Sequence, residues 1–203
     1  RQLLASHALA LAHTVEVQNL SLSDVALTLN TTRHREGSRL GLVAHTASDF
    51  VAKLRELAPR LENASTLVLA PDAFFAEGEA PQVAFMFPGQ GAQRVGLLKE
   101  LYDLHPAFRR HLDAIAAQVD DQLEKSLLEY LYAAPGEDAE EALRATEICQ
   151  PAMAALGLAL DRFFGDLGIR PAVTLGHSLG EFVAAASGGL ISHEDAMKFV
   201  TQR

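Results

Sequence analysis

The chain has 203 residues, of which 49% are hydrophobic and 21% are charged, so it can bury an ordinary core as one medium domain or two small ones. Its formal net charge of −9 argues against general nucleic-acid binding, and it means that an anionic substrate would need a locally basic site. We find no signal peptide and no apolar run near the roughly 18 residues of a membrane span. The single cysteine, Cys149, excludes an internal disulfide framework and indicates a reducing cytoplasm.

Residues 1–80 are predicted to form a small α/β domain. Amphipathic patterns predict helices over 2–13, 23–33 and 48–61, and segments 39–45 and 65–70 have the length and composition of strands. The stretch 71–82 contains prolines and a glycine and has neither helical nor strand period, so we expect a connector there.

Residues 81–203 are predicted to form a layered α/β domain, because strand patterns alternate with helical ones. Two continuous apolar runs, 83–87 and 172–176, are typical of parallel strands that are buried on both faces. Further helices are predicted at the positions 97–104, 106–119, 150–168 and 192–203. The last of these begins at Ser192, which has the spacing of a capping pair with Asp195.

The pattern Gly-x-Ser-x-Gly occupies 176–180, between the second apolar run and an alanine-rich helix. This context predicts a sharp strand-to-helix turn that exposes the Ser178 hydroxyl beside a helix N-terminus, as a nucleophile requires. The alternative is a glycine-lined packing turn without chemistry. His177 precedes the serine, but adjacent side chains diverge on a tight turn, so we expect it to lie near the substrate and not to act as the base. No other histidine stands out as a base.

A second glycine-rich turn, FPGQGAQ at 87–93, follows the first apolar run. Ligands bind at such turns in open α/β sheets, and its backbone amides could form an oxyanion hole together with the amide of Leu179. The alternative is an ordinary tight loop. No lysine follows the glycines, so a nucleotide site is not expected.

Three motifs, VAFMFPGQGAQ, TEICQPAM and GHSLGE, resemble in this order the acyltransferases that load malonyl-type units from coenzyme A onto acyl carrier proteins. The resemblance covers 83–203. Residues 1–82 more loosely resemble the α/β linker between ketosynthase and acyltransferase in modular polyketide synthases. The acyltransferase resemblance implies an α/β-hydrolase-like parallel-sheet core, and residues 81–203 would be the N-terminal portion of that domain.

The resemblance also implies roles for single residues. Ser178 matches the acyl-accepting nucleophile, and the backbone amides of Gln90 and Leu179 match the oxyanion hole. Gln150 matches a glutamine of the substrate pocket. Arg203 matches the arginine that pairs with the substrate carboxylate, and a guanidinium suits that task. The aliphatic Leu179 side chain favours malonyl over methylmalonyl units.

The family's catalytic histidine lies downstream of that arginine, so this chain is expected to hold a nucleophile and an oxyanion hole but no base. The resemblance implies malonyl-CoA as substrate, no metal and no permanently bound cofactor. The implied partners are a phosphopantetheine-bearing acyl carrier protein, the adjacent ketosynthase and the remaining half of the acyltransferase, within a homodimeric megasynthase.

Two other functions remain open. A serine esterase or thioesterase of the α/β-hydrolase type would share the serine turn and release its product to water, but it would need an acid and then a histidine later in the chain. The chain could also be a catalytically incomplete structural piece that docks against a ketosynthase.

Overall fold

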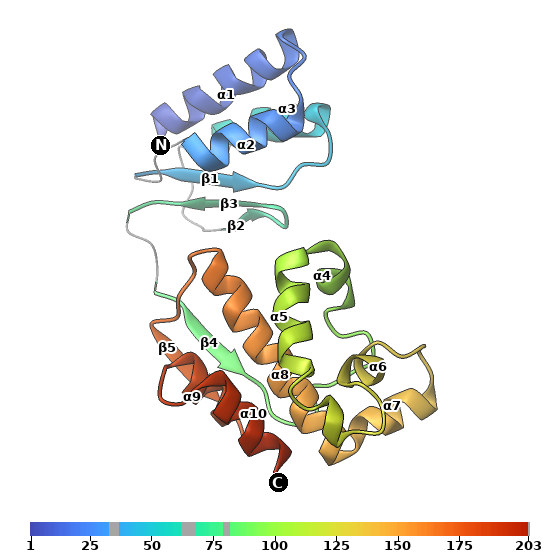
Figure 1. The fold of residues 1–203 in the computed structure, drawn as a ribbon. Helices are drawn as coiled ribbons and strands as arrows, with labels where there is room; N and C mark the ends of the chain where they lie inside the picture. The colour runs from blue at the N-terminus through green and yellow to red at the C-terminus, as the bar shows by residue number, and fades with distance from the viewer. Residues whose placement is uncertain (33–36, 62–67, 79–81, 203) are drawn as a thin grey trace. The chain divides into compact units, whose positions relative to one another are not determined.

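The computed structural model describes residues 1–32, 37–61, 68–78 and 82–202 (Figure 1). The chain divides into two compact units, Arg1–Pro81 and Gln82–Arg203, and each unit has a hydrophobic core of its own. Among the described residues, no helix is both long and apolar enough to cross a membrane.

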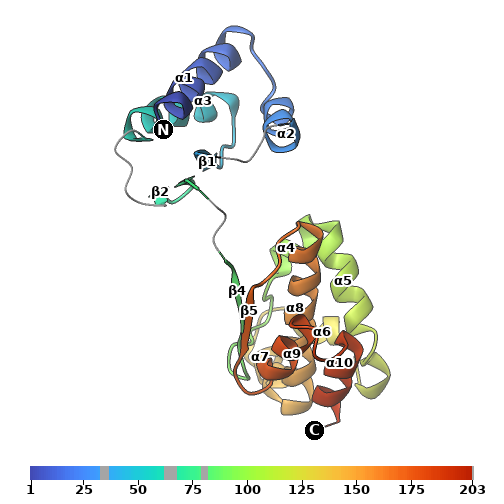
Figure 2. The same ribbon diagram turned by 90° about the vertical axis from the view of Figure 1, so that its left-hand side faces the viewer.

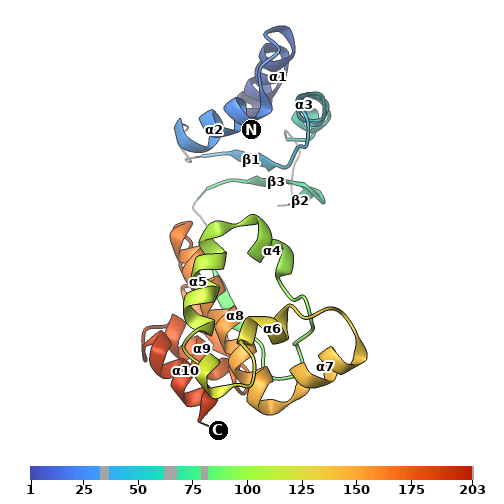
Figure 3. The ribbon, with the colours of Figure 1, turned by 45° about the vertical axis from the view of Figure 1, so that its right-hand side comes forward.

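The first unit packs three helices on one side of an antiparallel three-stranded sheet (Figure 3). Its elements are α1 (Gln2–Val17), α2 (Leu22–Thr32), β1 (Arg39–Leu42), α3 (Ala47–Leu61), β2 (Val68–Ala70) and β3 (Ala73–Ala76). The strand order is β1-β3-β2, so the last strand is the central one. Apolar side chains of α1 and α3 form the core, into which Phe75 of β3 packs.

The central strand β3 lies inside the segment that we expected to be a connector, so that expectation was wrong for 73–76. Two aromatic contacts explain why so short a strand forms. Phe75 is 4% exposed in the core. Phe74 pairs with Gly41 of β1, and its ring occupies the space that a side chain on Gly41 would need. A proline and a glycine flank this strand, so the sequence shows no clear strand period there.

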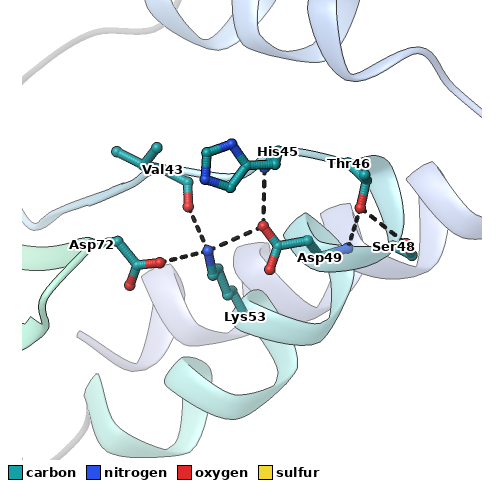
Figure 4. Close-up of polar contacts among 7 residues, drawn as sticks. All are labelled: Val43, His45, Thr46, Ser48, Asp49, Lys53 and Asp72. Atoms are coloured by element: carbon teal, nitrogen blue, oxygen red, sulfur yellow. Dashed lines mark hydrogen bonds and ion pairs between the residues drawn. The ribbon is translucent and has the colours of Figure 1, made fainter.

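A group of polar residues around Lys53, here called the Lys53 cluster, joins α3 to the end of β1 and to the β2–β3 turn (Figure 4). The Lys53 ammonium lies 2.8 Å from the Val43 carbonyl oxygen, 3.1 Å from the Asp49 carboxylate and 2.5 Å from the Asp72 carboxylate. Asp49 also accepts a hydrogen bond from the His45 amide, at 3.0 Å. These contacts lower the pKa of both carboxyl groups, chiefly through the His45 amide at Asp49 and through Lys53 at Asp72.

The second unit packs its helices around α8 and carries two parallel strands at one edge (Figure 2). Its elements are β4 (Ala84–Phe87), α4 (Lys99–Leu104), α5 (Pro106–Ala116), the 3-10 turn Asp120–Gln122, α6 (Leu127–Leu131), α7 (Glu137–Arg144), α8 (Thr146–Asp166), β5 (Val173–Gly176), α9 (Gly180–Ser187) and α10 (His193–Thr201). The parallel pairing of β4 with β5 confirms the expected strand arrangement, and it brings Phe87 beside Gly176.

The expectation that both strands are buried on both faces was wrong. Phe87 points into the core and is 9% exposed, whereas Met86 is 76% exposed, and Val173 and Leu175 are each about half exposed. Successive side chains of a strand point to opposite faces, and helices cover only one face here. We call Met86, Val173 and Leu175 the open face of β4 and β5.

The helices of this unit differ in detail from the predicted ones. Helix α8 begins at Thr146 and includes Pro151, whereas we expected a start near that proline. The short helices α6 and α7 were not predicted, because neither is long enough to show a clear period. The predicted cap of α10 is confirmed, since Ser192 Oγ accepts the Asp195 amide at 3.0 Å.

Candidate active site

Ser178 lies in the turn between β5 and α9, with its backbone in the left-handed region at a φ of 55°. A residue with a side chain rarely adopts this conformation, because its Cβ crowds the neighbouring carbonyl oxygen. Backbone hydrogen bonds hold the turn on both sides, from the His177 amide to the Phe87 carbonyl and from the Glu181 amide to the Ser178 carbonyl, each at 3.1 Å. The structure therefore confirms the sharp strand–serine–helix turn, and Ser178 is exposed on it.

The two glycines of the motif are required because neighbouring backbone atoms leave no room for a side chain at either position. A Cβ on Gly176 would overlap the backbone of Gly180 and Glu181, where α9 starts. A Cβ on Gly180 would overlap the carbonyl oxygens of Phe87 and Pro88, at the end of β4. Close approach of strand, turn and helix therefore depends on both glycines.

The glycine-rich turn after β4 packs directly against the serine turn. A Cβ on Gly89 would lie 2.8 Å from Nδ1 and from the carbonyl oxygen of His177, and 3.3 Å from Cβ of Ser178. In the described part of the chain, the backbone amides of Gln90 and Leu179 donate no hydrogen bond. Two free amides thus flank the serine from two different turns, as an oxyanion hole requires.

The first turns of α8 border the same loop. The Gln90 side-chain amide lies 3.4 Å from Thr146 Oγ1, at the start of α8. One turn later, Oε1 of Gln150 is buried and finds no hydrogen-bond partner among the described residues. An unsatisfied buried acceptor is costly, so this oxygen is available to a ligand donor. Burial raises the pKa of the neighbouring Cys149 thiol, although a backbone hydrogen bond with Gly91 opposes the shift.

The structure does not place a base at the serine. Among the described residues, no hydrogen bond joins the Ser178 hydroxyl to a histidine, and the His177 ring nitrogen faces Gly89. His111 and His193 contact aspartates elsewhere, at Asp166 and Asp161. Nor do three His, Cys, Asp or Glu side chains gather as a possible metal site in the described ranges.

Two further predicted site residues, Leu179 and Arg203, are not placed by the structure in their expected substrate-binding roles. The Leu179 side chain is 1% exposed and belongs to the hydrophobic core, so only its backbone amide borders the exposed serine. The preference for malonyl units that we linked to this side chain stays a prediction. Arg203 lies outside the described residues, and its role also stays a prediction.

Sequence reasoning missed one group of polar residues in this unit. Asp161 and Arg162 of α8 contact His193 at the start of α10, and Ser187 donates to Asp161. The histidine and aspartate are far apart in the sequence, so only the packing of α8, α9 and α10 reveals the contact.

Comparison with known proteins agrees with this geometry. The acyl transferase domain family matches residues 84–203. The PKS-NRPS hybrid synthetase ATPKS of Aspergillus niger is 35% identical over 182 residues, which make up 90% of this chain and 9% of that protein.

Two solved structures are also similar. The acyltransferase domain of ZmaA is 27% identical with a TM-score of 0.83, and the match covers 98% of this chain and 44% of that one. A malonyl-transacylase solved with its type II polyketide acyl-carrier protein (PlMCAT:AntF) is 32% identical with a TM-score of 0.51, over 60% of this chain and 37% of its own. This chain thus spans less than half the length of each of these proteins. It belongs to the acyl transferase domain family and is related to the acyltransferase domains of modular polyketide synthases.

Proposed function

We propose that this chain supplies the nucleophile and oxyanion hole for transfer of a malonyl-type unit from coenzyme A to the phosphopantetheine arm of an acyl carrier protein, in polyketide or related fatty acid biosynthesis. The observation that carries the proposal is the left-handed Ser178 between two turns that each present a free backbone amide. The family relationship and the malonyl-transacylase neighbour support the choice of substrate and carrier.

The reaction proceeds in two half-reactions. Ser178 Oγ attacks the thioester carbonyl carbon, the carbon–sulfur bond breaks, and the coenzyme A thiolate leaves and takes up the proton lost by the serine. The phosphopantetheine thiol then attacks the carbonyl carbon of the serine ester, the carbon–Oγ bond breaks, and Oγ regains the proton that the thiol loses. In both steps the Gln90 and Leu179 amides stabilise the oxyanion, and the N-terminus of α9 adds partial positive charge.

A serine hydroxyl needs a base, and the described residues place none beside it. We infer that the base belongs to the remainder of an acyltransferase domain, since the solved ZmaA domain is more than twice the length matched here. The open face of β4 and β5 supports this inference, because an exposed apolar sheet face is suited to cover by further chain.

The substrate would extend from Ser178 along the start of α8. Gln150 offers its buried acceptor to the substrate, and His177 lies at the rim of the turn. Arg203 would pair with the free carboxylate, and this pairing would offset the repulsion that a chain of net charge −9 exerts on malonate. Leu179 favours malonyl over methylmalonyl units.

The relatives also suggest the surroundings of this chain. ATPKS is a hybrid synthetase many times longer than the match, which supports a multidomain megasynthase as context. We propose that the first unit is the linker to an adjacent ketosynthase, that the assembly is a cytoplasmic homodimer, and that it requires no permanent cofactor.

Intact-protein mass spectrometry tests the proposal, on protein extended to the length of the solved acyltransferase domains. Malonyl-CoA should add one malonyl group, holo acyl carrier protein should remove it, and Ser178→Ala should abolish the adduct. Ser6→Ala, on the exposed part of α1, is the matched control and should acylate normally. An adduct that survives Ser178→Ala would refute the proposal.

The same experiment separates the two rival functions. Rapid release of free acid without a carrier protein would indicate the esterase. A wild-type chain that takes up no acyl group but binds a ketosynthase would indicate the structural piece. Full turnover by residues 1–203 alone would contradict the inference about the missing base.

A further inference from the structure

Four polar side chains meet where three helices of the second unit converge, and we call them the three-helix cluster. Ser187, the last residue of α9, donates to Oδ1 of Asp161 on α8 at 2.6 Å. His193, the first residue of α10, has Nε2 3.3 Å from Oδ2 of the same aspartate. Arg162 on α8 donates from Nε to Nδ1 of His193 at 2.9 Å.

These contacts assign a donor or acceptor role to each ring nitrogen of His193. A guanidinium can only donate, so Nδ1 of His193 accepts from Arg162, and Nε2 is the nitrogen that can donate to Asp161. The side chains of His193 and Asp161 are 19% and 13% exposed. Burial by itself raises the pKa of Asp161, but hydrogen bonds from His193 and Ser187 and the charge of Arg170 outweigh it, so the pKa is lowered.

The three-helix cluster lies at the end of the α9–α10 pair that is farthest from the reacting serine. Helices α9 and α10 pack against each other and are joined by residues 188–192 (Figure 1). Ser178 lies two residues before the first residue of α9, and α10 runs back from the cluster. A helix of 9 residues is about 13 Å long, so a small rotation at its first residue displaces its last turn appreciably.

We propose that the three-helix cluster positions α10 relative to the serine turn and thereby sets how well the site selects carboxylated acyl donors. His193 and Asp161 are positioning residues, since they lie at the end of α9 and α10 away from Ser178 and would act through α10. The inference rests on the proposed function, because Arg203, the expected carboxylate partner, is the second residue after the end of α10. Donors without a free carboxylate should depend far less on the cluster.

The test compares His193→Leu with His193→Gln in protein of the solved domains' length, using malonyl-CoA and acetyl-CoA. His193→Leu should raise KM for malonyl-CoA about tenfold with little change in kcat, and it should leave acetyl-CoA kinetics unchanged. His193→Gln should restore most of the selectivity, because its carbonyl can accept from Arg162 and its amide can donate to Asp161. A purely structural role would lower activity toward both donors equally and would overturn the inference.

A matched control is available on another face of α8. His111 of α5 contacts Asp166 of α8 at 2.7 Å. His111→Leu therefore also breaks a histidine–aspartate contact between two helices, but one that involves neither α9 nor α10. It should leave the preference for malonyl-CoA unchanged. An equal loss of preference in His111→Leu would overturn the inference. If His193→Leu does not fold, Asp161→Asn takes its place with the same expected outcome.

Hydrogen exchange separates this inference from the proposed function. Amides of α10 should exchange faster in His193→Leu than in wild type or His111→Leu, whether or not the protein transfers malonyl groups. Unchanged exchange would overturn the positioning role. A wild-type protein without acylation at Ser178 would instead refute the proposed function while leaving this measurement valid.

Discussion

The Lys53 cluster of the first unit and the serine turn of the second unit both lie at the end of a strand, yet they treat polar groups in opposite ways. In the cluster, the lysine contacts a carbonyl and two carboxylates (Figure 4). At the serine turn, the hydroxyl and the two flanking amides have no partner in the described part of the chain, and Ser178 has an unfavourable φ.

This contrast separates stability from activity. Paired groups contribute to the folded state, whereas unpaired groups and backbone strain lower its stability and remain available to a substrate. The strained turn persists because its surroundings leave no alternative, through the close approach of Gly176 and Gly180 to neighbouring backbone. Three substitutions and one pH titration test this difference, in order of decreasing effect.

Gly180→Ala should have the largest effect. The new methyl group would overlap the carbonyl oxygens of Phe87 and Pro88, so the turn must move away from the end of β4. We expect loss of acylation at Ser178 and a fall of about 3 kcal/mol in the free energy of unfolding of the second unit. Mass spectrometry and chemical denaturation measure the two effects.

Gly136→Ala is the control for that substitution. A methyl group there would meet open space, so acylation should match wild type, and stability should fall only by the cost of replacing a glycine at the N-cap of α7, about 1 kcal/mol. A folded, fully acylated Gly180→Ala protein would show that the close approach is not required.

Ser178→Gly should abolish acylation and at the same time stabilise the protein by about 1 kcal/mol, because glycine adopts the left-handed region without strain. Ser178→Ala also removes the hydroxyl but keeps the strain. The difference in denaturation midpoint between the two variants therefore isolates the backbone contribution. Equal midpoints would mean that the turn stores no strain.

Lys53→Met should destabilise the first unit modestly and leave acylation at Ser178 unchanged, since it leaves the Asp49 and Asp72 carboxylates without their shared cation. Arg55→Met serves for comparison, because Arg55 forms an exposed pair with Glu16 that contributes little. In thermal denaturation, the Lys53 variant should have a lower melting temperature than the Arg55 variant. The reverse order would show that the Lys53 cluster contributes no more than an exposed pair.

The smallest expected effect is on the pH dependence of the same unit. The pKa values of Asp49 and Asp72 are lowered in the folded state. Their stabilisation is therefore complete above the unfolded value of about 4 and is lost as the pH falls through the folded values. Urea denaturation between pH 7 and pH 3 measures the free energy of unfolding at each pH. This free energy should fall less steeply with pH in Lys53→Met than in wild type. Parallel curves for the two proteins would exclude these carboxylates as the cause of the pH dependence.

Local patterns in the sequence were sufficient to predict much of the second unit. The strand, serine and helix around Ser178 follow from apolar runs and glycine spacing, and the α10 cap follows from Ser192 and Asp195. The three motifs also identified the family, which the comparisons confirm.

The missed features depend on contacts between distant residues. Strand β3 forms because Phe74 covers Gly41 on another strand, which no local period reveals. The exposure of Met86 depends on which face of the strands the helices cover. The contact between Asp161 and His193 depends on how three helices converge.

The fully buried Cys149 gives this protein an internal probe of motion. It is the single cysteine of the chain, and it lies where α8 meets the loop that carries Gln90. Burial raises the pKa of its thiol, so a maleimide or disulfide reagent should react only when this junction opens. In the 203-residue chain, the labelling rate of this one thiol would then report how often α8 separates from the glycine-rich turn that carries Gln90.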